Sequence, residues 1–447
     1  MNIAQRLDRL PITKTHWMIL MATGVGWLFD SMDVGLVAFV MPAIQKEWHL
    51  LPTQLGMIGS IGMAGMAIGA ATSGMFADKW GRRTVILFTL VLFGLATGFC
   101  GLATGLSMLL VARFFVGAGL GGELPIASTL VSEFAPANVR GRMVVLLESF
   151  WAWGWIAAAL VAYLLVPTYG WRFAFFIGAI PALYAAFLRR AVPESPRFLE
   201  RQGRYEEADA IVTRLENEAG LTTEKKEKTS FVGNYRLTLA ELWSSHYWRR
   251  TLALWVLWLG INFGYYGFVT WIPTLLVTAK GFLIIRSLGF VLIMSFAQLP
   301  GYFSAAWLIE KIGRKPVLII YLAGTAVAAY FFGQSQSVNQ IMVWGCLLYF
   351  FSLGAWGGVY AYTPENYPTR ARGTGSGWAA AVGRLGAIAA PYAVGAIYQT
   401  YGKAVGYTSV FIMLTAVFAI TALVVLIFGV ETLGKSLDEI TENPSTT

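Results

Sequence analysis

The sequence predicts an all-α membrane protein with twelve transmembrane helices in two six-helix bundles, and three observations support this. The chain has 447 residues, of which 57% are hydrophobic and 13% charged, and its mean hydropathy is +0.61. Soluble domains carry about 25% charged residues. Twelve apolar runs are long enough to cross a bilayer, which takes about 20 residues of helix. Two short motifs also recur at one fixed separation, which indicates duplicated halves.

The twelve apolar runs alternate with short polar loops, and one long polar stretch separates the sixth run from the seventh. In chain order they cover residues 17–40, 55–77, 84–103, 106–132, 143–166, 171–188, 252–277, 283–308, 317–332, 341–362, 374–398 and 407–429. The chain therefore divides into three parts. These are an N-terminal bundle (1–188), a cytoplasmic linker with short helices (189–250) and a C-terminal bundle (251–447).

The linker carries its own helix signals. Ser195 followed by Pro196 is typical of a helix start, with Ser as the N-cap and Pro in the first helical position. Residues Arg204 to Glu218 form an amphipathic pattern that ends at Gly220. We therefore expect short helices here and no catalytic domain.

Orientation follows from the basic residues. Most Lys and Arg side chains fall in loops that share one side of the membrane, and placing the N-terminus inside puts them in the cytoplasm, as positive-inside bias requires. We therefore expect both termini to be cytoplasmic. This distribution accounts for the net charge of +9 without a nucleic-acid partner. Residues 1–15 lack the features of a cleavable signal peptide, so the first span should remain in the mature protein.

Cofactor and metal chemistry finds no support in the sequence. The chain has 2 Cys and 3 His residues, which lie far apart and lack metal-ligand spacing. A Gly-Lys-Ser/Thr phosphate loop is absent from the sequence, which argues against an ATP-driven pump. We expect no cofactor, no metal and no enzymatic activity.

Two motifs of the first half return in the second half, each 232 residues later. The stretch from Asp78 to Arg83 (DKWGRR) recurs from Glu310 to Lys315 (EKIGRK). The second motif, Glu133, Pro136, Arg140 and Gly141, recurs as Glu365, Pro368, Arg372 and Gly373. A separation of six spans keeps the orientation, so the halves are parallel repeats, and such repeats hold substrate near the midplane between them.

These motifs resemble the signatures of the major facilitator superfamily. The loop Gly74-x-x-x-Asp78-Lys79-x-Gly81-Arg82-Arg83 is similar to the superfamily's signature loop, and Arg113-x-x-x-Gly117-x-Gly119-x-Gly121-Gly122 to its second motif. The segments 193–197 (PESPR) and 431–435 (ETLGK) resemble the sugar-porter and organic-ion branch. The strings 26–33 (GWLFDSMD), 119–125 (GLGGELP), 147–151 (LESFW) and 300–307 (PGYFSAAW) look like bacterial niacin permeases.

The resemblance implies a carrier that imports nicotinate across the bacterial inner membrane, with protons as the coupling ion, by alternating access. We expect a monomer that needs the lipid bilayer, a small aromatic carboxylate and protons as its partners. Asp30 and Asp33 also match the acidic pair of aromatic acid:proton symporters.

Charged residues within the spans are the candidates for proton coupling, because each costs about 2.5–3.5 kcal/mol at a helix centre. Asp30 and Asp33 lie three residues apart and so share a helix face. On the fourth span, Arg113 and Glu123 are ten residues apart, about 15 Å of helix, and cannot pair with each other. We expect Arg113 to bond backbone carbonyls or an acid of the first span, and the family resemblance implies a proton-relay role as the alternative. Glu123 is expected to be either a proton site or an interhelical brace. Equally, one Asp could simply brace a neighbouring helix.

Candidates for substrate binding combine aromatic rings with a few polar groups, as ligand pockets do. On the fifth span Glu148, Trp151 and Trp155 share one face, although an interfacial Trp belt would look the same. In the C-terminal half the candidates at mid-depth are Tyr265, Tyr266, Gln298, Tyr302, Trp356 and Tyr360. For each single aromatic residue among them, packing in the protein core is the alternative and the more common role.

Arg384 is the sharpest of these candidates. It lies about ten residues into the eleventh span, close to the midplane, where a guanidinium needs an anion or water. Its planar fork suits a carboxylate, and Gly383 and Gly386 should leave space around it. The alternative is a permanent ion pair with Asp30 or Asp33.

The cytoplasmic motifs suggest a gate of ion pairs that break when the carrier opens inward, although positive topology signals alone would leave the same pattern. The proposed members are Asp78, Arg82, Arg83, Glu133, Arg140, Glu310, Arg314, Glu365 and Arg372. Other functions stay open: a carrier of benzoate-like acids or shikimate, an exporter of organic cations or drugs, and a membrane sensor that binds its ligand without transport.

Overall fold

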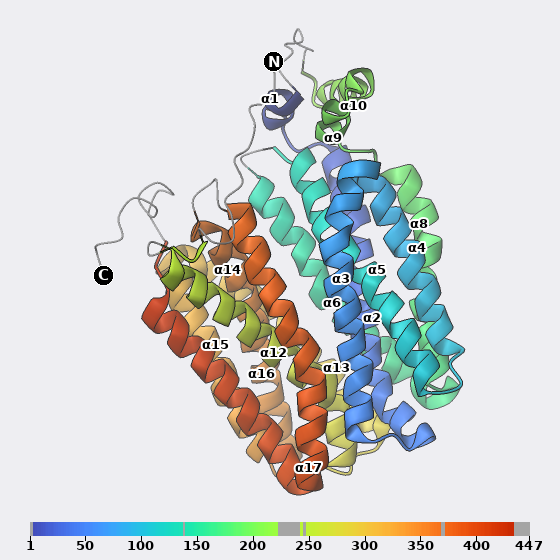
Figure 1. Ribbon diagram of the computed structural model, residues 1–447, viewed down its shortest axis with the longest axis vertical. Helices are drawn as coiled ribbons and strands as arrows, with labels where there is room; N and C mark the ends of the chain where they lie inside the picture. Colours follow the sequence, from blue (N-terminus) through green and yellow to red (C-terminus); the bar gives the residue numbers. More distant parts are fainter. Residues whose placement is uncertain (1–2, 137–138, 222–241, 245–246, 368–371, 433–447) are drawn as a thin grey trace. The chain divides into compact units, whose positions relative to one another are not determined.

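The computed structural model describes residues 3–136, 139–221, 242–244, 247–367 and 372–432. Within these ranges the chain is helical and contains no strand (Figure 1). The side chains of Asp78, Arg140 and Arg372, three of the predicted gate residues, lie outside what the structure describes.

The long helices follow the predicted apolar runs and extend past them by a few residues at most ends. In the N-terminal half they are α2 (Lys14–Trp48), α3 (Pro52–Trp80), α4 (Arg82–Gly101), α5 (Leu106–Phe134), α6 (Arg140–Tyr169), α7 (Trp171–Gly178) and α8 (Ile180–Ala191). In the C-terminal half they are α12 (Trp248–Thr278), α13 (Ile284–Phe296), α14 (Gln298–Ile312), α15 (Arg314–Gln334), α16 (Val338–Glu365) and α17 (Arg372–Phe428).

Eleven segments of the described chain are long and apolar enough to cross a membrane, and the last of them holds two crossings. Its 54 residues would reach about 80 Å as one straight helix, far more than a hydrocarbon core of about 30 Å. Gly402 interrupts it with a non-helical φ of 73°, between the two runs predicted from the sequence. The prediction of twelve spans is confirmed.

Two spans are broken near proline. Pro181 in α8 cannot donate to the carbonyl of Ile177, and Pro300 in α14 cannot donate to that of Phe296. The helices accordingly separate at Ala179 and at Ala297, so α7 with α8 and α13 with α14 each form one crossing.

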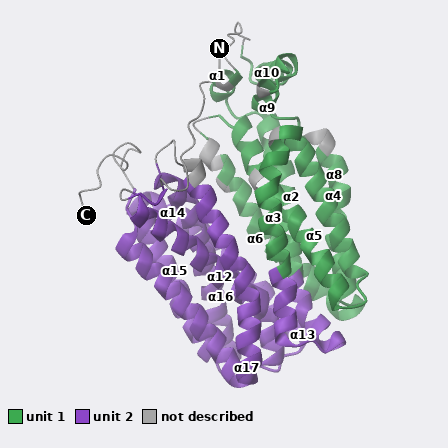
Figure 2. Ribbon diagram, in the orientation of Figure 1, with its two compact units in different colours: residues 1–36, 61–232 green, residues 37–60, 233–447 purple. Residues whose placement is uncertain are grey.

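The chain forms two compact units (Figure 2). Unit 1 comprises residues 1–36 and 61–232, and unit 2 comprises residues 37–60 and 233–447. The end of α2 and the start of α3 thus group with the C-terminal helices, where Gly56 lies against Pro391. Within unit 2, Thr53 also donates to the Gln399 side chain over 2.8 Å.

In unit 1 the backbones of α3 and α5 touch directly. A Cβ at Gly65 would overlap the carbonyl oxygen of Phe114, and one at Gly117 would overlap that of Gly62. Only glycine permits this approach, which is the small-residue packing common between membrane helices. The glycine run of the second span therefore has a packing role.

The segment between the two halves contains two short helices, α9 and α10. Ser195 caps α9 (Pro196–Arg201) by accepting from the Phe198 amide, and α10 spans Tyr205–Glu218 before Gly220, which has a φ of 69°. The sequence did not indicate α1 (Ile3–Asp8), which packs against α10 and α9 at one end of unit 1 (Figure 1).

Arg6 of α1 is buried in this contact. It donates to Glu216 over 2.7 Å and to Asp209 over 2.6 Å, while Arg9 donates to Glu216 over 2.8 Å. Close by, Glu218 accepts from the backbone and hydroxyl of Thr15 at the start of α2. Glu216 and Glu218, at the end of α10, therefore hold α1 and the start of α2 in contact with α10.

Candidate functional site

Two candidate proton-coupling residues of unit 1 form a buried ion pair. Arg113 of α5 donates to Asp33 of α2 over 2.7 Å. The other oxygen of Asp33 accepts from the Thr97 hydroxyl of α4 over 2.6 Å. Arg113 thus bonds an acid of the first span, one of the two partners expected for it, while Thr97 was not indicated by the sequence.

Asp30 and Glu123 are neighbours. Asp30 lies on α2 three residues before Asp33, the acid of the ion pair. Asp30 and Glu123 are both buried, and none of their four carboxyl oxygens has a hydrogen-bond donor among the described residues. The two carboxyl groups interact with each other. Gly26, one turn before Asp30, gives Glu123 room, because a Cβ there would overlap Oε1 of Glu123. The four candidates therefore divide into a neutralised pair and a pair of acids without a cation.

The candidate ring-binding face of α6 packs against α2. Trp151 lies 5.2 Å from Trp27, measured between ring centroids, and its carbonyl accepts from Ser31 over 2.5 Å. Trp155 is fully buried, and Glu148 is half-buried on the same face. Trp27 belongs to this group although the sequence reasoning did not name it; its spacing of three residues before Asp30 was the available signal.

Unit 2 holds a continuous aromatic cluster on α12 and α16. Trp258 contacts both Trp356 and Tyr360, with centroids 5.9 and 5.6 Å apart. Tyr265 contacts Trp356 at 6.0 Å and Tyr266 at 5.3 Å. Four predicted substrate-binding residues are thus brought together, and Trp258 joins them.

Arg384 of α17 lies beside this cluster. Its side chain interacts with that of Tyr266, and in unit 2 it forms no ion pair with a described carboxylate. The expected space next to Gly383 and Gly386 is not empty, because a Cβ at these positions would meet Asn262 and the Leu259 carbonyl of α12. These glycines bring α17 close to α12 and so place Arg384 beside Tyr266.

Gln298 and Tyr302 lie on α14. Gln298 stands at the break between α13 and α14, fully buried, and neither atom of its amide has a partner among the described residues. Tyr302 is nearly buried against Gly357 of α16. Both side chains belong to unit 2.

Four of the described gate residues form two ion pairs, one in each unit. Arg82 lies 3.4 Å from Glu133, and its repeat counterpart Arg314 lies 3.0 Å from Glu365. Glu310 is exposed, and Arg83 donates its backbone N–H to Glu194.

Glu194 and Glu431 complete these two clusters. Glu194 accepts from the backbone N–H of Arg82 over 3.0 Å. Glu431 accepts from the N–H groups of Arg314 and Lys315 over 3.1 and 3.0 Å. The sequence placed both glutamates in family-like motifs but gave them no role.

Burial raises the pKa of the Glu194 carboxyl above its ordinary value, although hydrogen bonds from Ser195 and the start of α4 oppose this effect. Its carboxyl is therefore held between desolvation, which disfavours the charge, and helix-end N–H groups, which favour it.

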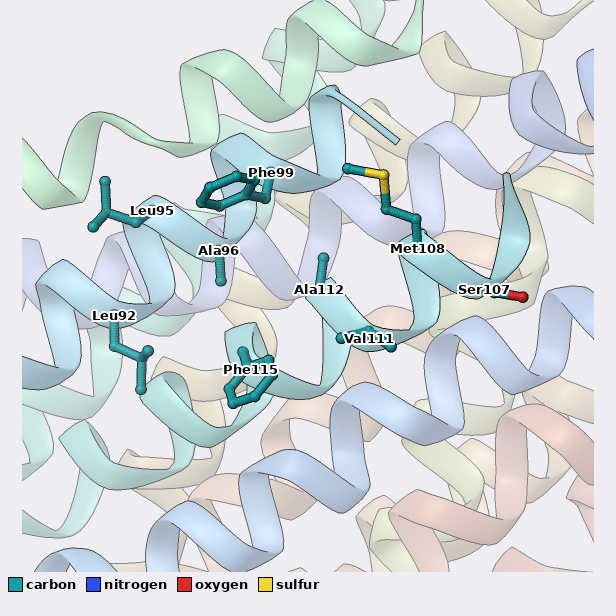
Figure 3. A pocket seen from close by; sticks show the side chains of 9 residues that line it. All are labelled: Leu92, Leu95, Ala96, Phe99, Ser107, Met108, Val111, Ala112 and Phe115. Atoms are coloured by element: carbon teal, nitrogen blue, oxygen red, sulfur yellow. The ribbon is translucent and has the colours of Figure 1, made fainter. Parts of the chain in front are cut away.

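A separate hollow of about 650 Å³ lies between α4 and α5 in unit 1 (Figure 3). Its lining is apolar apart from one hydroxyl and consists of Leu92, Leu95, Ala96, Phe99, Ser107, Met108, Val111, Ala112 and Phe115. It offers no cation to a carboxylate, so it is not a candidate for the substrate site. Among the described residues no cluster of His, Cys, Asp or Glu could hold a metal ion.

Comparison with known proteins places this geometry in a family. A family model described as "Sugar (and other) transporter" matches residues 30–443. The chain is 48% identical to "Niacin transporter NiaP" of Acinetobacter baylyi over 98% of this chain and 100% of that protein. It is 44% identical to "Putative niacin/nicotinamide transporter NiaP" of Bacillus subtilis over 94% and 97%.

Solved structures agree on the fold. The xylose transporter XylE from E. coli, in a partially occluded inward open conformation, superposes with a TM-score of 0.76 at 20% identity, covering 95% of this chain and 100% of that one. A bacterial homologue of the human lysosomal transporter Spinster gives 0.75 at 16% identity, covering 97% and 100%. The chain belongs to the sugar (and other) transporter family within the major facilitator fold, and it is a multi-span membrane transporter of a small molecule rather than an enzyme.

Proposed function

We propose that this transporter imports nicotinate together with protons by alternating access. The observation that carries the substrate assignment is the nearly full-length similarity to two proteins named as niacin transporters. The chemistry of unit 2 agrees with it. Arg384 is a cation without a described acid partner in its own unit, beside a cluster of aromatic rings, and nicotinate is a flat ring with a carboxylate.

Arg384 is the carboxylate clamp in this proposal. A guanidinium binds a carboxylate through two parallel hydrogen bonds, and the half-buried site strengthens them relative to water. The rings of Tyr265, Tyr266 and Trp356 offer faces for the pyridine. Nicotinamide lacks the negative charge, so the clamp favours the acid over the amide.

Asp30 and Glu123 are the proton-coupling pair. Asp33 already has a counterion in Arg113, whereas two adjacent carboxyls without a cation cannot easily both be charged away from water. A proton shared by Asp30 and Glu123 relieves that repulsion. The Asp33–Arg113 pair then has a positioning role, since it fixes the neighbouring turn of α2 against α5.

The deciding experiment is counterflow of radiolabelled nicotinate in proteoliposomes. We expect preloaded nicotinate to drive uptake of the label, with benzoate and nicotinamide as weaker competitors. Saturable binding without exchange would indicate a sensor and contradict the proposal. Preferential exchange of benzoate or of an organic cation would reassign the substrate.

The orientation belongs to the same proposal: both termini face the cytoplasm of a bacterial cell, and the transporter acts as a monomer. Cysteine variants test it, with Glu206→Cys expected to be protected from an impermeant reagent in intact cells and Lys403→Cys expected to react. Lys226, also expected to be inside, lies outside the described residues.

A further inference from the structure

Arg250 is a buried cation that the proposed function leaves without a role. It lies in the first turn of α12 and is only 7% exposed. Its Nη1 atom is buried and has no hydrogen-bond partner among the described residues. A charge removed from water without a counterion is strongly unfavourable, so the site calls for an anion.

Arg250 forms no ion pair with a described carboxylate; one acidic group in its surroundings, Glu431, interacts with Tyr362. The groups that interact with it electrostatically are Tyr247, Tyr362 and Tyr367. The buried arginines of unit 1 differ in this respect: Arg6 is paired with Glu216 and Arg113 with Asp33. Arg250 therefore differs from these two buried arginines, each of which has a carboxylate partner.

Hydrogen-bond donors exceed acceptors around the guanidinium. The Tyr362 hydroxyl accepts from the Val430 amide over 2.8 Å and also interacts with the Asn366 side chain, and no hydrogen bond that it donates is found among the described residues. The Tyr367 hydroxyl donates to Thr251 over 3.0 Å, and Thr251 donates in turn to the Leu242 carbonyl over 2.7 Å. The acceptors are thus occupied, and two donors, on Arg250 and Tyr362, remain.

This site is distinct from Arg384. Arg384 interacts with Tyr266, which lies 16 residues further along α12 than Arg250, or about 24 Å of helix. In the proposed orientation Arg250 stands at the cytoplasmic end of α12. Since it is buried inside unit 2, a small anion fits it better than a lipid headgroup at the bilayer surface.

We propose that Arg250 and Tyr362 form a second, cytoplasmic site for the carboxylate of the transported substrate, occupied on the release side of unit 2. This inference rests on the proposed function for the identity of the anion. Arg250 supplies the charge and Tyr362 a second donor. The site is weaker than the one at Arg384, because release requires easy dissociation.

Equilibrium binding of radiolabelled nicotinate to the purified full chain tests this. We expect two classes of site in the wild type, one tight and one weak. Arg384→Ala should remove the tight class and keep the weak one. Arg250→Gln should keep the tight class and weaken the other about tenfold, which corresponds to about 1.4 kcal/mol.

The neighbouring Arg249 provides a matched control, because it is exposed and stacks 5.5 Å from the Trp248 ring. Arg249→Gln should leave both classes intact. Arg250→Lys should keep the weak class at reduced affinity. Tyr362→Phe should weaken the same class, which keeps the inference testable if Arg250→Gln does not fold.

The possible results distinguish a failure of this inference from a failure of the proposed function. A single class in the wild type, or a weak class whose affinity is unchanged in Arg250→Gln, overturns this inference while leaving nicotinate transport standing. No binding of nicotinate to either class overturns the proposed function itself. A lipid phosphate is the other possible source of the anion, and repeating the binding measurement in phosphatidylcholine and phosphatidylglycerol vesicles tests it. If phosphatidylglycerol abolishes the weak class of nicotinate sites, the ligand of Arg250 is a lipid phosphate, and the assignment to substrate is overturned.

Discussion

Glu194 and Glu431 perform the same structural task in the two units. Each carboxylate accepts from backbone N–H groups at the start of a helix, α4 for Glu194 and α15 for Glu431. Each helix follows a glycine of positive φ, 94° at Gly81 and 100° at Gly313. Neither glutamate immediately precedes the helix that it caps, so the cap also ties a distant segment to the helix end.

Removing one of these caps should destabilise the transporter without changing substrate choice. Glu194→Ala leaves the first N–H groups of α4 without their acceptor, and loss of a cap costs about 1 kcal/mol. Thermal unfolding of the detergent-solubilised protein measures the effect. Glu206→Gln, in the first turn of α10 and exposed, serves as the control. An unchanged unfolding temperature in Glu194→Ala would contradict the capping role.

Arg384→Ala should abolish tight nicotinate binding while the protein still inserts and folds. The guanidinium supplies two charge-assisted hydrogen bonds, each worth about 1.5–3 kcal/mol, so a loss of 100-fold or more is expected on that scale. Arg384→Lys should restore binding in part, because an ammonium lacks the planar fork. Near-normal affinity of a folded Arg384→Ala protein would exclude this residue as the clamp.

Asp30→Asn should abolish accumulation of nicotinate driven by a pH gradient but spare exchange, because exchange need not cycle the proton. Asn cannot release a proton yet keeps the size of the side chain. Parallel uptake and counterflow assays in one proteoliposome preparation separate the two steps. Proton-driven accumulation at the wild-type level would remove Asp30 from coupling and leave Glu123 as the candidate.

Breaking the Asp33–Arg113 pair should be costly, and removing both charges should cost less. Arg113→Gln leaves Asp33 buried without its counterion, which costs about 3–5 kcal/mol. The double variant Asp33→Asn/Arg113→Gln has no isolated charge. Thermal unfolding of the four proteins forms a double-mutant cycle. A loss in the double variant equal to the sum of the losses in the two single variants would show that the two charges do not stabilise each other.

The contact of α1 with α10 should weaken in acid. Burial by itself raises the pKa of Glu216, but hydrogen bonds and charges of Arg6 and Arg9 outweigh it and hold the pKa below its ordinary value. The folded state therefore favours the carboxylate. The stabilisation is complete above the ordinary Glu value of about 4.3 and is lost as the pH falls through the lower, folded-state value.

Hydrogen exchange of the backbone amides in α1 measures this contact. Protection should fall as the medium is acidified below about pH 4, and Glu216→Gln should lose protection at neutral pH as well. Glu207→Gln is the control, since its pair with Arg204 is exposed at both ends. Acid-independent protection of α1 would contradict the role assigned to Glu216.

The sequence predicted those features that depend on local pattern. The lengths of the apolar runs predicted the twelve spans. The N-cap preference of Ser195 and the position of Pro196 after it predicted the start of α9. For Arg113 the sequence predicted two kinds of partner, an acid of the first span or backbone carbonyls. In the structure its partner is Asp33 of α2.

The features that the sequence did not reveal depend on contacts between distant segments. Glu194 caps a helix that begins 112 positions earlier, and Arg6 meets Glu216 across 210 positions. Neither contact follows from periodicity or spacing. The space expected beside Gly383 is filled by α12, because a glycine permits close approach as readily as it leaves a gap.

The backbone contact between α3 and α5, called the seam below, affects the side-chain entropy lost on folding. Its close contacts, among them Gly65 with Phe114 and Gly117 with Gly62, join backbone to backbone. Glycine has no rotamers to immobilise, so forming this seam costs none of the side-chain entropy that burying longer residues requires. Weak Cα–H···O contacts can form along it. The two helices therefore reach backbone contact at a low cost in side-chain entropy.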